Sequence, residues 1–225
     1  MNNSTIKAYE YLLNRGATRL CHFTKVKSLT HILTSEDGIL ATDFIPTDYK
    51  QQNDLERLDN AEDYVSCSLQ YPNCWFWRIV KGRDADAIFK EWVVLAIDLR
   101  ILKDKAFKFC ACNAAKEMGK YIQSNPEKIN NLFSEPTIQN RYRAPNMLKS
   151  CPSDDQAEIM IYKNIPISFV NGIIVGNENS ADNIAAILKT LGKAIPVFIS
   201  ASVCNTDWSN IIRQGRIPVE TEYIY

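Results

Sequence analysis

The sequence predicts one mixed domain, α/β or α+β in class, over residues 1–225. A chain of this length can bury a sizeable core as one domain, and no change in composition marks a hinge between halves. The apolar run 92–98 has the length and character of a central strand covered on both faces. Residues 64–69 alternate between apolar and polar like a half-exposed strand, whereas residues 5–14 carry apolar side chains at helical spacing.

The start of the chain reads as helix, strand and helix, over residues 5–14, 19–24 and 26–33. The strand runs directly into the second helix through His22, Phe23 and Thr24. Such a junction exposes free backbone amides and suits a polar ligand, although a histidine at a strand end is also a common structural residue.

A long polar stretch follows, from residue 41 to residue 60. Long polar loops inside compact domains are usually lids over sites or disordered insertions. Arg57 lies there between Asp54 and Asp59. It is a candidate phosphate ligand, and a surface salt-bridge cluster is the alternative.

The middle of the chain alternates strands with helices. In the strand 64–69, Ser66 and Ser68 share the polar face. The aromatic residues 74–77 fit a core or the wall of a pocket better than a base-stacking platform. We further expect helices at 84–91, 113–122 and 126–133, and strands at 92–98 and 106–110.

A second irregular stretch, residues 135–155, carries Arg141, Tyr142 and Arg143 and runs into a strand at 156–162. In that strand Gln156 and Glu158 point to one face, while the apolar residues between them point into a core. A carboxylate there is a candidate for chemistry, and a half-solvated strand is the alternative. Strands at 169–175 and 196–200 and helices at 181–191 and 207–213 complete the chain.

Several functional classes are disfavoured by composition and motifs. Lys+Arg 26 against Asp+Glu 26 gives no global basic field, so any nucleic-acid binding needs a local patch. The seven cysteines are irregularly spaced and resemble small buried residues of a reducing cytosol, and with two histidines they do not form a zinc site. No apolar run suggests a membrane span, so we expect a soluble, cytoplasmic protein. Rossmann, P-loop, serine hydrolase and kinase motifs are missing.

The order of the remaining motifs resembles the ADP-ribosyltransferases, and within them the DarT family of DNA ADP-ribosyltransferase toxins. The matching pieces are residues 20–24 with the helix to residue 40, residues 53–59, residues 66–69 with Tyr71-Pro72-Asn73, and residues 156–160 with Ile165-Pro166. Residues 57–77 are more similar to the guanine-modifying branch than to the thymine-modifying one. The resemblance implies an α+β fold with central split mixed β-sheets flanked by helices.

The resemblance also implies a role for each candidate residue. Glu158 would stabilise the positive charge that develops on the ribose of NAD, the co-substrate, and accept a proton from the acceptor. Arg57 would grip the diphosphate and assist catalysis. NAD would also contact His22, Phe23 and Thr24, and Ser66 and Ser68 would brace Glu158 and the ribose.

The implied acceptor is guanine in single-stranded DNA. Gln156 would orient the base, and Arg141, Tyr142, Arg143 and Lys149 would contact phosphates and stack on bases. A toxin of this kind would be paired with a DarG-like antitoxin whose macrodomain removes ADP-ribose, and it would use no metal. An acceptor in RNA, a terminal phosphate or a protein is the alternative, as is a nucleic-acid-binding module without turnover.

Overall fold

The computed structural model describes residues 3–46, 59–83 and 91–225. Its α-helices are α1 (Asn3–Asn14), α2 (Val26–Thr34), α3 (Cys74–Arg83), α4 (Ile101–Asp104), α5 (Glu178–Thr190) and α6 (Asp207–Arg213). Its 3-10 helices are η1 (Thr42–Phe44), η3 (Lys116–Gly119), η4 (Pro126–Phe133) and η5 (Ile167–Phe169). Its strands are β1 (Arg19–Lys25), β2 (Ile39–Leu40), β3 (Tyr64–Leu69), β4 (Trp92–Asp98), β5 (Phe107–Cys110), β6 (Ile122–Gln123), β7 (Glu158–Tyr162), β8 (Asn164–Ile165), β9 (Val170–Val175), β10 (Val197–Ile199) and β11 (Thr221–Tyr223).

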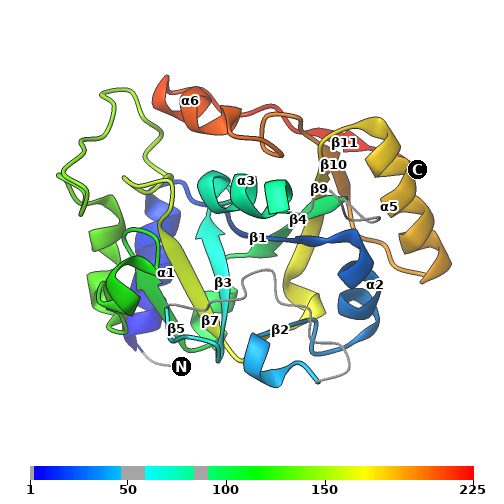
Figure 1. The fold of residues 1–225 in the computed structure, drawn as a ribbon, viewed down its shortest axis with the longest axis horizontal. Helices are drawn as coiled ribbons and strands as arrows, with labels where there is room; N and C mark the ends of the chain where they lie inside the picture. Colours follow the sequence, from blue (N-terminus) through cyan, green and yellow to red (C-terminus); the bar gives the residue numbers. More distant parts are fainter. Residues whose placement is uncertain (1–2, 47–58, 84–90) are drawn as a thin grey trace.

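The main sheet has the order β11-β10-β9-β4-β1-β3-β7-β5-β6. Strands β9 and β10 pair in parallel, whereas β4 pairs antiparallel with both β9 and β1. The sheet is therefore mixed, as the predicted fold class requires (Figure 1). Strand β4 lies in the interior of the sheet and is buried from Trp92 to Ile97, which confirms it as a central strand covered on both faces.

The sheet divides between β1 and β3. Strand β1 pairs with β4 along its whole length, from Arg19 to Lys25, but its pairing with β3 is confined to Leu20 and Cys21. Beyond Cys21 the two strands no longer form a ladder. The implied split of the sheet is thus confirmed, and its position is fixed one residue before His22.

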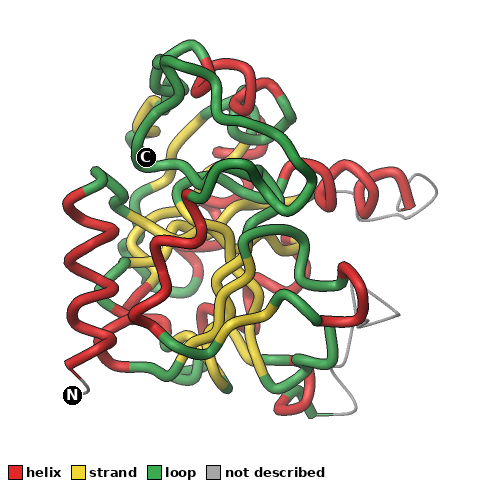
Figure 2. Tube along the Cα trace, turned by 90° about the vertical axis from the view of Figure 1, so that its left-hand side faces the viewer, coloured by secondary structure: helices red, strands yellow, loops and turns green. Residues whose placement is uncertain are grey.

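Helices cover both faces of this sheet. Figure 2 shows α1 and α3 on opposite sides of the strands. The side chains of α1 join a large apolar cluster with alternate residues of β3 and β4, such as Val65 and Leu95. Residues of α3 and α6 join a second cluster on the other face, with Cys21 and Val94. The two clusters account for the alternation that predicted these strands.

Some predicted elements differ from the structure. The helix expected at 113–122 is replaced by the short η3 and by β6, which pairs with β5. Glu117 and Met118 have left-handed φ angles of 48° and 56°, and Gly119 follows with a φ of 84°. An added Cβ at Gly119 would lie 2.7 Å from the carbonyl oxygen of Asp59, so this segment turns tightly against a neighbouring loop and cannot continue as a helix.

Two further differences concern helix type and a missed strand. The helix expected at 126–133 is present with these bounds as a 3-10 helix, whereas the edge strand β11 was not expected. Residues 84–90, where most of a helix was expected, and most of the long polar loop, residues 47–58, lie outside the described residues.

The cysteines behave as small apolar residues. All seven are buried and free, which confirms the expectation of burial. In the parts of the chain that the structure describes, no helix is both long enough and apolar enough to span a bilayer.

Candidate active site

Glu158 begins strand β7 and is partly buried. Its Oε1 atom accepts a hydrogen bond of 2.9 Å from the backbone N–H of Ala114. Cys110, at the end of β5, is the ladder partner of Glu158, so the chain leaving β5 turns back and brings the amide of Ala114 to the carboxylate. The carboxylate is therefore held by backbone at a defined place on the strand.

The two serines of β3 lie on the same face of the sheet as Glu158. Ser66 is paired with Met160, and the next printed pair joins Cys67 to Ile159. One step further along the two strands lie Ser68 and Glu158, at neighbouring positions on one face. Ser68 is buried, and its hydroxyl oxygen accepts from the backbone N–H of Asn73 at 2.9 Å. Ser68 thus fixes the turn after β3 close to the carboxylate.

His22 connects the two halves of the sheet where their ladder ends. Its Nδ1 atom lies 2.9 Å from the carbonyl oxygen of Ser66. Burial lowers the pKa of His22 below its ordinary value, and the hydrogen bond to Ser66 only partly offsets this effect. A carbonyl can only accept, so the neutral ring carries its proton on Nδ1 and presents Nε2 as an acceptor.

Phe23 and Thr24 continue β1 beyond the split. The ring of Phe23 stacks on Trp77 of α3, with ring centres 5.5 Å apart, and Thr24 is buried. The aromatic residues Trp75, Phe76 and Trp77 lie in the first turn of α3, and Trp77 belongs to the apolar core. Phe23 and His22 are consecutive residues of β1, so the ring of Phe23 leaves the strand on the face opposite to that of His22.

Gln156 is brought close to Glu158 by the same turn that holds the carboxylate. Its Oε1 atom accepts from the side-chain amide of Asn113 at 3.5 Å, and Asn113 directly precedes Ala114. Gln156 lies just before β7 and not within it. The turn at Asn113 and Ala114 thus contacts both Gln156 and Glu158. The sequence did not predict this turn, because a helix was expected at 113–122.

The predicted DNA-contacting residues fall into two groups. Arg141, Tyr142 and Lys149 are exposed, and 71% of the surface of Tyr142 is accessible. Arg143 is different, because its guanidinium donates to the carbonyl oxygens of Cys151 and Leu148 at 2.7 and 2.8 Å. Only 10% of its side chain is exposed. Arg143 therefore stabilises the loop through its own backbone carbonyls. The prediction that Arg143 contacts a DNA phosphate is wrong, because such a contact needs an exposed guanidinium.

Arg57 lies outside the described residues, so its predicted contact with the diphosphate and its role in catalysis stay predictions. Within the described ranges, no group of three or more His, Cys, Asp or Glu side chains could hold a metal ion.

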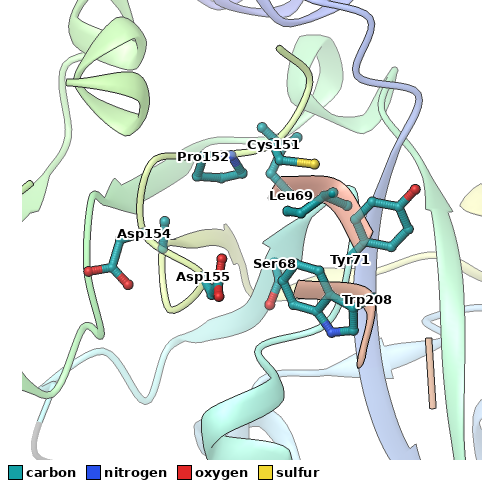
Figure 3. Close-up of a pocket in the computed structure, with 10 residues that line it drawn as sticks. Ser68, Leu69, Tyr71, Cys151, Pro152, Asp154, Asp155 and Trp208 are labelled. Atoms are coloured by element: carbon teal, nitrogen blue, oxygen red, sulfur yellow. The ribbon is translucent and has the colours of Figure 1, made fainter. Parts of the chain in front are cut away.

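Two buried acids were missed by the sequence reasoning. Asp154 and Asp155 immediately precede Gln156, and both are buried. Burial raises the pKa of Asp154, and its Oδ1 accepts from the backbone N–H of Gln156 at 2.9 Å. Figure 3 shows the two carboxylates on different sides of the chain, around a small pocket that Ser68 and Trp208 also line. The available signal was a pair of acids directly before an apolar strand.

The comparisons with known proteins agree on one family. The family model described as "DarT: ssDNA thymidine ADP-ribosyltransferase, DarT" matches residues 21–208. None of the curated protein sequences matches this chain.

Similar solved structures carry the same family name. DarT of Thermus sp. 2.9 in complex with ADP-ribosylated ssDNA is 16% identical, with a TM-score of 0.61 over 84% of this chain and 96% of that one. The same protein in complex with NAD+ is 15% identical, with a TM-score of 0.59 over 83% and 97%. Thermosipho africanus DarTG in complex with ADP-ribose is 15% identical, with a TM-score of 0.56 over 83% of this chain and 50% of that one.

These likenesses support the fold, and the family model decides the membership, because it spans most of the chain and includes His22, Ser66, Ser68 and Glu158. The chain belongs to the DarT family of ADP-ribosyltransferases.

Proposed function

We propose that this protein is an NAD-dependent mono-ADP-ribosyltransferase that modifies guanine bases in single-stranded DNA, with Glu158 as its catalytic carboxylate. The observation that carries the proposal is the position of Glu158 at the start of β7, held by the Ala114 amide on the face that Ser68 also occupies. Membership of the DarT family supports the reaction type.

NAD supplies the ADP-ribose when the bond between its ribose and nicotinamide breaks and the bonding electron pair leaves with nicotinamide. Glu158 would then act in two ways. Its negative charge would stabilise the positive charge on the ribose carbon. As a new bond forms between that carbon and the exocyclic amine of guanine, the carboxylate would take the proton that the amine loses.

The groups on β1 suit the co-substrate. The neutral ring of His22 presents Nε2 as an acceptor, which matches a ribose hydroxyl or an amide N–H. Phe23 offers an aromatic face, and Thr24 continues the same strand. Arg57 is proposed to bind the diphosphate, because a guanidinium forms paired hydrogen bonds with phosphate oxygens. DarT of Thermus sp. 2.9 has been solved with both NAD+ and carba-NAD+.

The acceptor side is proposed to consist of Gln156 and the exposed loop residues. Gln156 is held beside Glu158 by Asn113 and could hydrogen-bond to a base edge. Tyr142 and Arg141 are exposed on the preceding loop, where an aromatic ring and a cation suit a flexible single strand. Lys149 is exposed on the same loop and suits a phosphate.

Guanine is favoured by the likeness of residues 57–77 to the guanine-modifying branch, and thymine is the second candidate because the family description names thymidine. The test uses NAD labelled in its adenylate and oligonucleotides of dA that contain a single dG or a single dT. Label on the dG strand alone is the expected result. Label on the dT strand alone would replace guanine by thymine, and label on neither strand would overturn the proposed function.

Assays with other acceptors test the alternative substrates, which are RNA, a terminal phosphate and protein. RNA of the same sequence, a strand with a terminal phosphate and a total protein extract should remain unlabelled. We also propose that the protein acts as a toxin countered by a macrodomain antitoxin, since one similar structure is of a DarTG protein in complex with ADP-ribose. Expression of the wild-type chain should then halt growth, and co-expression of an ADP-ribose-removing macrodomain should restore it.

A further inference from the structure

Helix α6 lies against the irregular segment that leads into Glu158. The backbone N–H of Leu148 donates to the carbonyl oxygen of Ile212 at 3.1 Å. Near the end of the segment, the Oδ2 atom of Asp155 accepts from Arg213 Nη2 at 2.9 Å and from the hydroxyl of Ser209 at 2.6 Å. The segment is therefore tied to α6 at two separate points (Figure 1).

The contact at Asp155 is an ion pair that is largely shielded from water. Only 4% of the Asp155 side chain is exposed, against 35% for Arg213. Arg213 also donates through Nη1 to the carbonyl oxygen of Ser209, at 2.8 Å, so the guanidinium is fixed within its own helix. Removal of one partner from such a pair leaves a buried charge uncompensated, which makes the contact hard to break while the helix is in place.

Helix α6 is itself anchored to the core. The ring of Trp208 stacks on Tyr71, with ring centres 5.3 Å apart, and Trp208 and Ile212 are both buried. Tyr71 follows β3 by two residues, just beyond Ser68. One helix therefore contacts both the end of the strand that carries Ser68 and the segment that precedes Glu158.

The ion pair acts on a tight turn. The side chain of Asp154 accepts from the backbone N–H of Gln156 at 2.9 Å, and its carbonyl oxygen accepts from the N–H of Ala157 at 3.1 Å. Asp155 lies inside this turn, and its carboxylate and that of Asp154 leave the chain on different sides (Figure 3). Gln156, the residue proposed to orient the acceptor base, directly follows Asp155 in this turn. A shift of Asp155 would therefore move Gln156 as well.

We propose that the ion pair of Asp155 and Arg213, with Ser209, is a positioning device for the acceptor base: it holds the turn before β7 so that Gln156 meets the base beside Glu158. The proposal rests on the proposed function and adds two positioning residues on α6. Ser209 and Arg213 lie beyond residue 208, where the match to the family model ends.

The test compares three variants of the full chain. Arg213→Gln removes the charge, Arg213→Lys restores it, and Arg216→Gln removes an exposed charge just after α6 as a matched control. Two rates are measured for each variant, which are ADP-ribose transfer to a dG oligonucleotide and NAD hydrolysis without DNA. We expect R213Q to lower kcat for transfer by about 10- to 100-fold, because small misplacements of reacting groups have effects of that order. NAD hydrolysis should stay within about twofold of wild type, R213K should recover part of the loss, and R216Q should match wild type.

Amide hydrogen exchange supplies a readout that does not depend on activity. In R213Q the segment 153–158 should exchange about tenfold faster than in wild type, since the turn has lost its anchor, while R216Q should not change. Ser209→Ala removes the second donor to Asp155 and replaces R213Q if that variant does not fold. Unchanged exchange, or an equal fall of transfer and hydrolysis, would overturn the positioning role. A wild-type protein that labels no DNA would overturn the proposed function, and the exchange experiment would still decide on the anchor.

Discussion

The substitution Glu158→Gln tests the proposed chemistry most directly. The change keeps the shape of the side chain and an oxygen that can accept from the Ala114 amide, which lies 2.9 Å from the carboxylate. Glu158 is partly exposed, so the substitution removes a charge that water already reaches. We therefore expect the free energy of unfolding to change by less than about 1 kcal/mol.

The expected loss of rate follows from the charge that the variant lacks. At a separation of about 4 Å and an effective permittivity of about 20, a carboxylate stabilises a unit positive charge by about 4 kcal/mol. A barrier raised by that amount lowers the rate by about three orders of magnitude. This estimate agrees with the loss of about 10²- to 10³-fold that follows when a single stabilising group is removed from an active site.

The assay is the initial rate of label transfer from NAD to the single-dG oligonucleotide, with the KM for NAD measured alongside. E158Q should lose kcat and leave the KM for NAD within about threefold of wild type, because the charge acts mainly on the transition state. Glu178→Gln, which removes an exposed carboxylate from the first turn of α5, is the matched control and should keep full activity. A folded E158Q variant that keeps more than about a tenth of the wild-type kcat would refute the reasoning, since so small a loss is below any value that the charge argument allows.

Three further predictions concern single side chains. His22→Ala should raise the KM for NAD by about 3- to 10-fold, which corresponds to the loss of one hydrogen bond. Burial keeps the pKa of His22 below 6.5, so the ring stays neutral and the wild-type KM should be constant between about pH 6.5 and 8. Glu220→Gln should lower the free energy of unfolding in urea by about 1.5–3 kcal/mol, because Glu220 forms two hydrogen bonds of 2.6 and 2.5 Å with Arg19. Asp154→Asn should raise the melting temperature at neutral pH. Burial raises the pKa of Asp154 in the folded state, so the ionised carboxylate destabilises the folded protein at neutral pH. The stability gained by the variant should shrink as the pH falls through that raised pKa towards 3.8.

Each of these predictions has a clear contrary result. An unchanged KM for NAD in H22A would remove His22 from the co-substrate site. A Glu220→Gln variant as stable as wild type would mean that water replaces the contact with Arg19 at no cost. If D154N were less stable than wild type at neutral pH, the carboxylate of Asp154 would have to be ionised and favourably paired in the folded protein.

The sequence predicted the strands of the sheet better than the segments between them. Val65, Cys67 and Leu69 alternate with polar residues and are buried on one face, and Trp92 to Ile97 is buried throughout. Both patterns follow from local alternation and burial, which a sequence displays directly. Strand β11 has no such pattern, because it lies at an edge and Thr221 and Glu222 are exposed.

The sequence predicted only those parts of the site in which the side chains project from strands. Glu158, Ser66 and Ser68 share a face because side chains alternate along paired strands. The amide of Ala114 could not be assigned from sequence, because it contacts Glu158 through the turn after β5, where the sequence predicted a helix. The single domain over residues 1–225 and the role of Arg57 remain predictions.

The split between β1 and β3 makes the geometry of the site depend on contacts outside the sheet ladder. Past Cys21, His22 Nδ1 and the Ser66 carbonyl join the two strands. At the opposite end of β1, Arg19 donates to the Gln70 carbonyl at 3.0 Å and is paired with Glu220. Loss of Glu220 should therefore loosen β1 against β3 as well as lower stability. An E220Q variant that is destabilised but binds NAD with an unchanged KM would show that Glu220 is not needed to keep the two strands in register at the site.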